Sequence, residues 1–211
     1  MKRLAGLLLT MVAFCAVPRA ASADVFGFGC YHMVNATNCA TLESQISVDI
    51  TQSGDWLNFK FVNSGPSASF IDGLYFSDPP PSLLGGSPSF IYSNPSTVQF
   101  SATCMPGDLP NNWGTTYCSD ADAPASKNGV NPGEWVQISY KLVSPASLTT
   151  VVNGLWANTF DIGIKVQGFA NGGSEWATVG NTVPEPATLA LFAVGAGIAG
   201  LRRRRLARKA S

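Results

Sequence analysis

Apolar and polar residues alternate with a period of two along several segments in the middle of the chain. The clearest of these segments are residues 46–50, 56–62, 136–142 and 160–167. In the second segment Leu57, Phe59 and Phe61 alternate with Asn58 and Lys60. This period is typical of antiparallel strands that bury one face and expose the other. The pattern therefore predicts a sheet whose apolar face borders a core.

Shorter apolar runs and frequent turn residues extend this pattern. Further strands are expected at residues 70–76, 90–92 and 97–102. Turns rich in Gly, Pro and Ser separate the segments at residues 53–55, 63–66, 78–81 and 85–88. One short helix is expected over residues 147–155. Short strands with frequent turns predict a mainly β fold, an antiparallel β-sandwich-like ectodomain over residues 24–180.

The formal net charge of zero conceals a strong segregation of charge along the chain. Between Asp24 and Val183 four lysines stand against twelve acidic residues, which gives a formal charge of −8, and this region contains no arginine. Binding to nucleic acid requires clustered Lys and Arg side chains that neutralise phosphates. We therefore expect no nucleic acid partner.

The first residues have the three parts of a secretory signal peptide. Lys2 and Arg3 are positive, an apolar stretch runs from Leu4 to Val17, and Ala21 and Ala23 supply small residues at the two positions that a signal peptidase recognises. The apolar stretch is short for a membrane span, which disfavours the alternative of an uncleaved anchor helix. Residues 1–23 are therefore predicted to be removed by signal peptidase.

An uncharged apolar segment followed by arginines ends the chain. The segment from Ala187 to Leu201 covers about 22 Å as a helix, less than the roughly 30 Å of a bilayer core. Snorkelling side chains and a locally thinner bilayer can make up the difference. The basic residues that follow are Arg202, Arg203, Arg204 and Arg205. The positive-inside rule predicts a single transmembrane helix with these arginines in the cytoplasm and the ectodomain outside.

The whole tail, residues 181–211, resembles the PEP-CTERM sorting signal of Gram-negative bacteria. The resemblance rests on Pro184, Glu185 and Pro186 within residues 183–188, on the glycine-rich apolar helix over residues 187–201, and on the basic end over residues 202–209. It implies that exosortase, a transpeptidase-like membrane protease, recognises the Pro-Glu-Pro motif and removes the helix. It also implies that the ectodomain reaches the cell surface or the extracellular space, in association with exopolysaccharide or biofilm.

Four cysteines follow the signal peptide, at Cys30, Cys39, Cys104 and Cys118. An even number of cysteines in an exported chain is typical of disulfide bonds. Three pairings are possible, and we favour the local one, Cys30–Cys39 with Cys104–Cys118, because it closes short loops. The spacings match no zinc-binding motif, and the chain has a single histidine, His32. We therefore expect neither a metal nor a cofactor.

Catalytic motifs are not evident in the sequence. The chain has no nucleophile elbow, no metalloprotease motif and no phosphate-binding loop. Glu134, Asp161 and Glu175 offer the carboxylates of a glycosidase if the fold brings them together. Isolated surface acids are far commoner, so we expect that the protein is not an enzyme, with a secreted hydrolase as the less favoured alternative.

Two other groups of residues suggest binding. An oxygen-rich loop follows Cys118 and offers calcium ligands, although a solvated loop is the simpler interpretation. Its candidate ligands are Asp120, Asp122, Asn128, Asn131 and Glu134. Five tryptophans either fill the core or cover its edges, or they provide surfaces on which sugars stack. The sequence thus predicts a surface or matrix protein sorted by its tail, and a carbohydrate-binding module is the alternative.

Overall fold

The computed structural model describes residues 23–103 and 113–179, and these form ten strands and three helices. The strands are β1 (Ala23–His32), β2 (Ile46–Ser53), β3 (Trp56–Asn63), β4 (Phe70–Ser77), β5 (Leu84–Tyr92), β6 (Phe100–Ser101), β7 (Tyr117–Ala121), β8 (Trp135–Leu142), β9 (Asp161–Gln167) and β10 (Ser174–Val179). The helices are α1 (Ala36–Gln45), α2 (Ala125–Asn128) and α3 (Leu148–Ala157).

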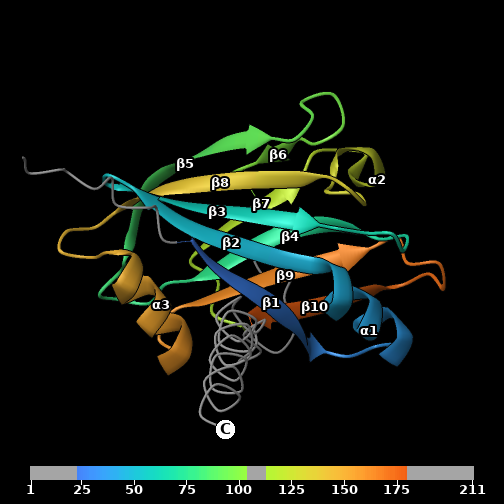
Figure 1. The fold of residues 1–211 in the computed structure, drawn as a ribbon, viewed down its shortest axis with the longest axis horizontal. Coiled ribbons are helices and arrows are strands. Elements are labelled where there is room, and N and C mark those ends of the chain that lie inside the picture. Colours follow the sequence, from blue (N-terminus) through green and yellow to red (C-terminus); the bar gives the residue numbers. More distant parts are fainter. Residues whose placement is uncertain (1–22, 104–112, 180–211) are drawn as a thin grey trace, which may run out of the picture.

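All strands belong to one antiparallel sheet in the order β5-β8-β3-β2-β1-β10-β9-β4-β7-β6. Strand β1 joins its two halves. Gly27, in the first part of β1, lies opposite Ser47 of β2, whereas the next residue, Phe28, lies opposite Val179 of β10. The sheet therefore folds over along β1, and its two halves form the front and back layers in Figure 1.

Aromatic side chains from both layers meet in the core. Phe76 of β4 packs against Phe59 and Phe61 of β3 and against Tyr140 of β8, with ring centroids 4.9–6.2 Å apart. All four side chains are almost completely buried. Burial of each such side chain contributes about 1.5–3 kcal/mol to folding, so these contacts hold the two layers together.

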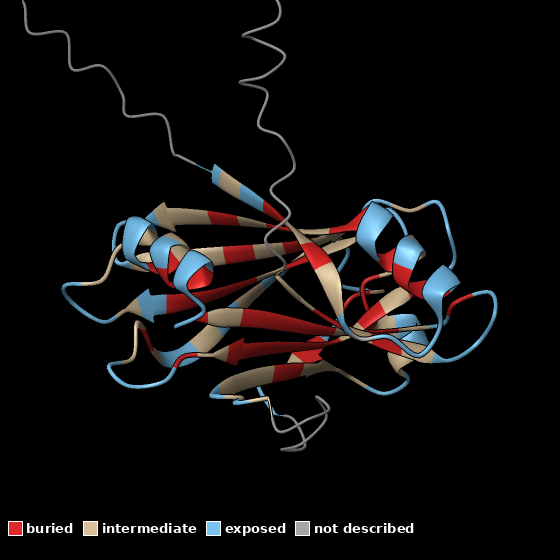
Figure 2. Ribbon diagram, turned by 90° about the horizontal axis from the view of Figure 1, so that it is seen from below, coloured by how far each residue is buried: buried red, intermediate tan, exposed pale blue. Residues whose placement is uncertain are grey.

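Helices α1 and α3 cover the regions where the two layers diverge. Helix α1 contacts β1 and β10, and α3 contacts β2 and β9. In Figure 2 the buried sides of both helices face the strands and their exposed sides face outward. The side chain of Asn35 caps α1 by accepting hydrogen bonds from the backbone N–H groups of Thr37 and Asn38, and Ser147 caps α3 in the same way.

The mainly antiparallel β class and the clearest predicted elements are confirmed. Strands β2, β3, β8 and β9 occupy the alternating segments, β4 occupies residues 70–77, and α3 occupies the expected short helix. The sandwich-like packing is built from one continuous sheet because β1 takes part in both layers. The segment expected as a strand over residues 97–102 is shorter, since only Phe100 and Ser101 pair with β7.

The expected signal peptide and transmembrane helix lie outside the described residues, apart from Ala23 at the start of β1. Among the residues that the structure describes, no helix has the length and apolar character needed to cross a membrane.

Candidate functional site

The first and last strands of the domain, β1 and β10, pair with each other. Strand β1 begins at Ala23, the last residue before the expected signal cleavage, and β10 ends at Val179 opposite Phe28. Val179 is five positions before Pro184, the first residue of the predicted sorting motif. Among the other predicted residues, Ala21, Cys104, Pro184, Glu185, Pro186, Arg202, Arg203, Arg204 and Arg205 lie outside the described residues.

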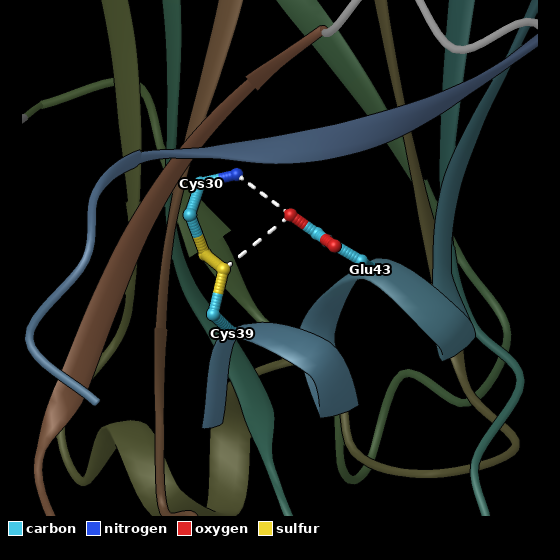
Figure 3. A group of neighbouring side chains, drawn as sticks. All are labelled: Cys30, Cys39 and Glu43. Carbon is cyan, nitrogen blue, oxygen red and sulfur yellow. Dashed lines mark hydrogen bonds between the residues drawn. A yellow bond between two sulfur atoms is a disulfide. The ribbon is translucent and has the colours of Figure 1, made fainter. Parts of the chain in front are cut away.

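A disulfide between Cys30 of β1 and Cys39 of α1 confirms the first predicted pairing, with the two Cα atoms 6.0 Å apart. The carboxylate of Glu43 lies beside this bond (Figure 3). Its Oε1 accepts a hydrogen bond from the backbone N–H of Cys30 at 3.2 Å and lies 3.4 Å from Sγ of Cys39. Because both sulfur atoms are bonded to each other, this group offers no thiolate to a metal.

Cys118 of β7 is also a disulfide cysteine. Its expected partner, Cys104, lies outside the described residues, so the second pairing stays a prediction.

The carboxylates considered for a hydrolase lie in different parts of the fold. Asp161 begins β9 opposite Ser77, whereas Glu175 lies opposite Val166 near the other end of β9. At about 3.3 Å per residue the backbone positions of the two residues lie roughly 17 Å apart along β9, whereas the carboxyl groups of a glycosidase pair lie about 5–9.5 Å apart. Glu134 lies ahead of β8 and is held by Thr97 and Asn131. The three acids therefore occupy separate places in the fold.

Asp161 has a carboxyl group whose pKa is raised by burial. Burial raises its pKa from 3.8 to about 6, and hydrogen bonds from the backbone N–H of Ile162, at 2.8 Å, and from Trp113 partly oppose the rise. A raised pKa is typical of a general acid, but it also results from simple burial. Glycoside cleavage needs a second carboxylate next to the general acid. Neither Glu175 nor Glu134 lies next to Asp161, so neither supplies it.

The oxygen-rich loop is occupied by its own internal contacts. Asp122 accepts a hydrogen bond from Ser101 at 2.6 Å, and the amide nitrogen of Asn128 donates to the backbone oxygens of Asp122 and Ala123. The amide nitrogen of Asn131 donates to Gly129 and to Glu134. A metal site would need at least three ligand atoms close together. Among the described residues, no three acidic side chains of this loop bring their oxygens within 4.8 Å of one another.

The tryptophans do not fill the core, and most of them lie at its edges, as one of the two structural interpretations expects. Trp56, Trp113, Trp135 and Trp176 are half-buried, and Trp156 on α3 is 45% exposed. Trp56 and Trp135 lie on the outer face of β3 and β8, beside lysines of the neighbouring strand. Sequence alone does not indicate these Trp–Lys pairs because they depend on the register between β3 and β8.

The backbone position of His32 is the last residue of β1, opposite Trp176. A separate surface pocket of about 560 Å³ lies between α3 and the loop that contains Pro79, Pro80 and Pro81. Its lining residues are Pro79, Pro80, Pro81, Leu83, Thr150, Asn153, Gly154, Ala157, Asn158 and Thr159. None of these side chains exchanges a proton near neutral pH, so the pocket supplies no general acid or base.

Comparison with known proteins gives a match for the tail of the chain. Residues 182–205 match the family model described as the PEP-CTERM protein-sorting motif. The search of curated proteins gave no match. The search of solved structures gave none either.

Proposed function

Because this chain carries the PEP-CTERM protein-sorting motif, we propose that it is an exported surface or matrix protein whose tail exosortase processes. The match at residues 182–205 carries this proposal. The motif supports exosortase as the processing partner and export to the cell surface as the destination. It includes Pro184, Glu185, Pro186 and the arginines that follow the apolar segment.

The route to the surface has two cleavages. Signal peptidase removes residues 1–23, which frees Asp24 at the start of the domain. The helix over residues 187–201 then holds the chain in the inner membrane, with the domain on the outer side and Arg202 to Arg205 in the cytoplasm. Exosortase cuts at the Pro-Glu-Pro motif, and the domain is released or transferred. The helix thus serves as a temporary anchor.

At the surface the domain acts as a non-enzymatic component of an exopolysaccharide matrix or biofilm. This part of the proposal is supported by the local contacts of its carboxylates. Glu134 and Glu175 bind neighbouring backbone or side-chain groups, and the acids considered for hydrolysis lie in different parts of the fold. A structural carboxylate needs only those contacts, whereas a glycosidase needs two carboxylates facing one bond.

The fate of the tail tests the proposal. Mass spectrometry of surface protein from a host with active exosortase is expected to recover peptides of the domain and none from residues 189–201. Glu185→Ala is expected to leave the precursor in the membrane fraction with those peptides intact. Glu43→Gln, which changes an exposed carboxylate of the domain, is the control and is expected to be processed like the wild type. Glu175 is not used for this purpose because its buried carboxylate supports the fold. Wild-type surface protein that retains residues 189–201 would show that the tail is a permanent anchor.

A further inference from the structure

The outer face of strands β5, β8, β3 and β2 carries an ordered group of aromatic and polar side chains. Trp56 begins β3 and Trp135 begins β8. Because these strands are antiparallel, the two tryptophans lie toward opposite ends of the ladder, Trp56 opposite Lys141 and Trp135 opposite Val62. From Trp56 to Val62 the strand rises about 20 Å, which separates the two rings along the sheet.

Each tryptophan is held by a lysine of the facing strand. The Nζ atom of Lys60 lies 4.5 Å from the ring centroid of Trp135, and that of Lys141 lies 5.6 Å from the centroid of Trp56. These distances are within the range of cation–π interactions, which fix the rings relative to the sheet. The salt bridge of the described residues, Lys165 with Asp72, lies on the other half of the sheet.

Amide and hydroxyl side chains lie between the two rings. The hydroxyl of Ser139 donates to Oδ1 of Asn58 at 2.8 Å, and Nε2 of Gln137 donates to the hydroxyl of Ser139 at 3.4 Å. Asn58 Nδ2 also lies 3.4 Å from the hydroxyl of Thr51. A primary amide has two N–H donors, so Asn58 and Gln137 each keep one for a ligand.

This face is open and differs from a typical protein-binding surface. In Figure 1 the β5-β8-β3-β2 face is turned toward the viewer, and none of the three described helices lies in front of it. The large exposed apolar side chains on the same face, Ile91 of β5 and Val25 of β1, lie at its two margins. Protein interfaces place apolar residues at the centre and polar residues at the rim, which is the reverse of this arrangement.

We propose that this face binds a neutral polysaccharide chain laid along β3 and β8. Sugar rings stack on Trp56 and Trp135, and their hydroxyl groups bond to Asn58 and Gln137. The face carries Lys60 and Lys141, with Asp49 opposite Lys60, so its own net charge is small. An acidic polymer is disfavoured because the whole region between Asp24 and Val183 has a formal charge of −8, which repels polyanions. The proposal rests on the proposed place of the domain in an exopolysaccharide matrix and names the surface that makes the contact.

Affinity electrophoresis of the processed protein, purified from the cell surface, tests this binding. Native gels contain dextran, hydroxyethyl cellulose or galactomannan as neutral probes, and alginate as the acidic probe. At least one neutral polymer is expected to retard the wild-type protein. Trp56→Ala and Trp135→Ala are each expected to weaken this binding roughly ten-fold. Trp156→Ala is the matched control, because this exposed tryptophan lies on α3, away from the face.

A second substitution separates binding from folding. Gln137→Ala removes a half-buried surface amide and is expected to weaken binding while leaving the unfolding temperature unchanged. Retardation by alginate alone, by no neutral polymer, or equally for the Trp56→Ala and wild-type proteins would overturn the proposal. The result is independent of sorting, because an unprocessed chain extracted in detergent carries the same face. Failure to bind by a correctly processed protein therefore rejects the ligand and leaves the sorting function intact.

Discussion

Glu175, at the start of β10, binds the backbone of Asn35, a residue 140 positions earlier in the chain. Its Oε1 accepts a hydrogen bond from the N–H of Asn35 at 2.7 Å, and its Oε2 accepts one from Val34 at 2.8 Å. The side chain of Glu175 is completely buried. Because Asn35 caps α1, one carboxylate fixes the place where this helix begins relative to the sheet.

Glu175→Gln is expected to destabilise the domain by about 1.5–3 kcal/mol. The amide keeps one acceptor but places its NH₂ group against a backbone N–H, so one buried donor loses its partner. Denaturant unfolding of the mature protein measures the loss. Glu43→Gln, at an exposed carboxylate on α1, is the control and is expected to cost much less. Equal losses for the two variants would contradict the structural role of Glu175.

Removal of the Cys30–Cys39 disulfide is expected to lower the free energy of unfolding by about 2–3 kcal/mol. The bond closes a loop with a sequence separation of 9 residues and ties α1 to β1. The double variant Cys30→Ala/Cys39→Ala isolates this bond from the one at Cys118. Non-reducing peptide mapping of wild-type protein should recover Cys30 linked to Cys39 and Cys104 linked to Cys118. A crossed pairing would reject the local assignment.

The stability of the domain is expected to depend on pH through Asp161. Its pKa is about 6 in the fold against an ordinary value of 3.8, so between these pH values the folded state binds more protons than the unfolded state. Stability from this group is therefore greatest below about pH 4 and falls as the pH rises to about 6. Asp161→Asn should gain about 1–3 kcal/mol over wild type at pH 7, and the gain should vanish near pH 4. A difference that does not change with pH would refute this.

The mature protein is expected to begin at Asp24. Ala23 pairs with Thr51 at the very end of the β1–β2 ladder, so its removal costs the sheet only a terminal pair. Edman sequencing of exported protein measures the N-terminus. Replacing Ala21 and Ala23 by Leu should block cleavage, since a signal peptidase requires small residues there. Exported wild-type protein that still begins at Met1 would contradict the signal peptide.

Neutralising Arg202 to Arg205 is expected to let part of the precursor leave the membrane uncut. Moving arginine side chains into the apolar core of the bilayer is costly, so the four charges keep the end of the chain in the cytoplasm. Without them the chain can pass through the membrane more easily. Cell fractionation with mass spectrometry would detect full-length chain, including residues 189–201, outside the membrane fraction. Replacement of the four arginines by lysines is the control and should preserve processing. Identical fractionation of the neutral and lysine variants would show that the charges do not hold the tail.

The strands that could be predicted from sequence are those whose inward side chains are large and apolar. Leu57, Phe59 and Phe61 identify β3 directly, because all three are buried and separated by polar residues. Strand β10 gives no such signal, since its fully buried residues are Glu175 and Ala177. Neither the carboxylate of Glu175 nor the methyl group of Ala177 marks a buried strand in the sequence. Their burial becomes clear only once the strands that pair with β10 are known.

Helix α1 was not predicted for a related reason. Its buried face consists of Asn38, Cys39, Leu42 and Gln45, and only Leu42 would mark an apolar stripe. The amide of Gln45 is buried because it bonds to Asn63, Ser67 and Ser69, which are distant in the sequence. Long-range partners make these polar residues suitable for burial, and no local pattern reveals such partners.

The candidate binding face shows the same limit. Tryptophans and amides on alternating strands are visible in the sequence, but their placement on one surface depends on β8 pairing with β3 and not with another strand. The sorting motif has no such dependence, because Pro184, Glu185 and Pro186 form a contiguous motif. It was therefore predictable, and the comparison confirms it.

On the proposed export route, the pairing of Phe28 with Val179 also determines when the domain can complete its fold. The first strand to emerge on the outer side, β1, has to wait for the last, β10, before the sheet closes. Forming this contact closes a loop that includes nearly the whole domain, which costs conformational entropy. Until β10 has emerged, the chain therefore lacks the pairing between β1 and β10. On that route the fold is complete only after β10 has emerged, ahead of the sorting motif at residues 182–205, so we expect exosortase to receive a finished domain.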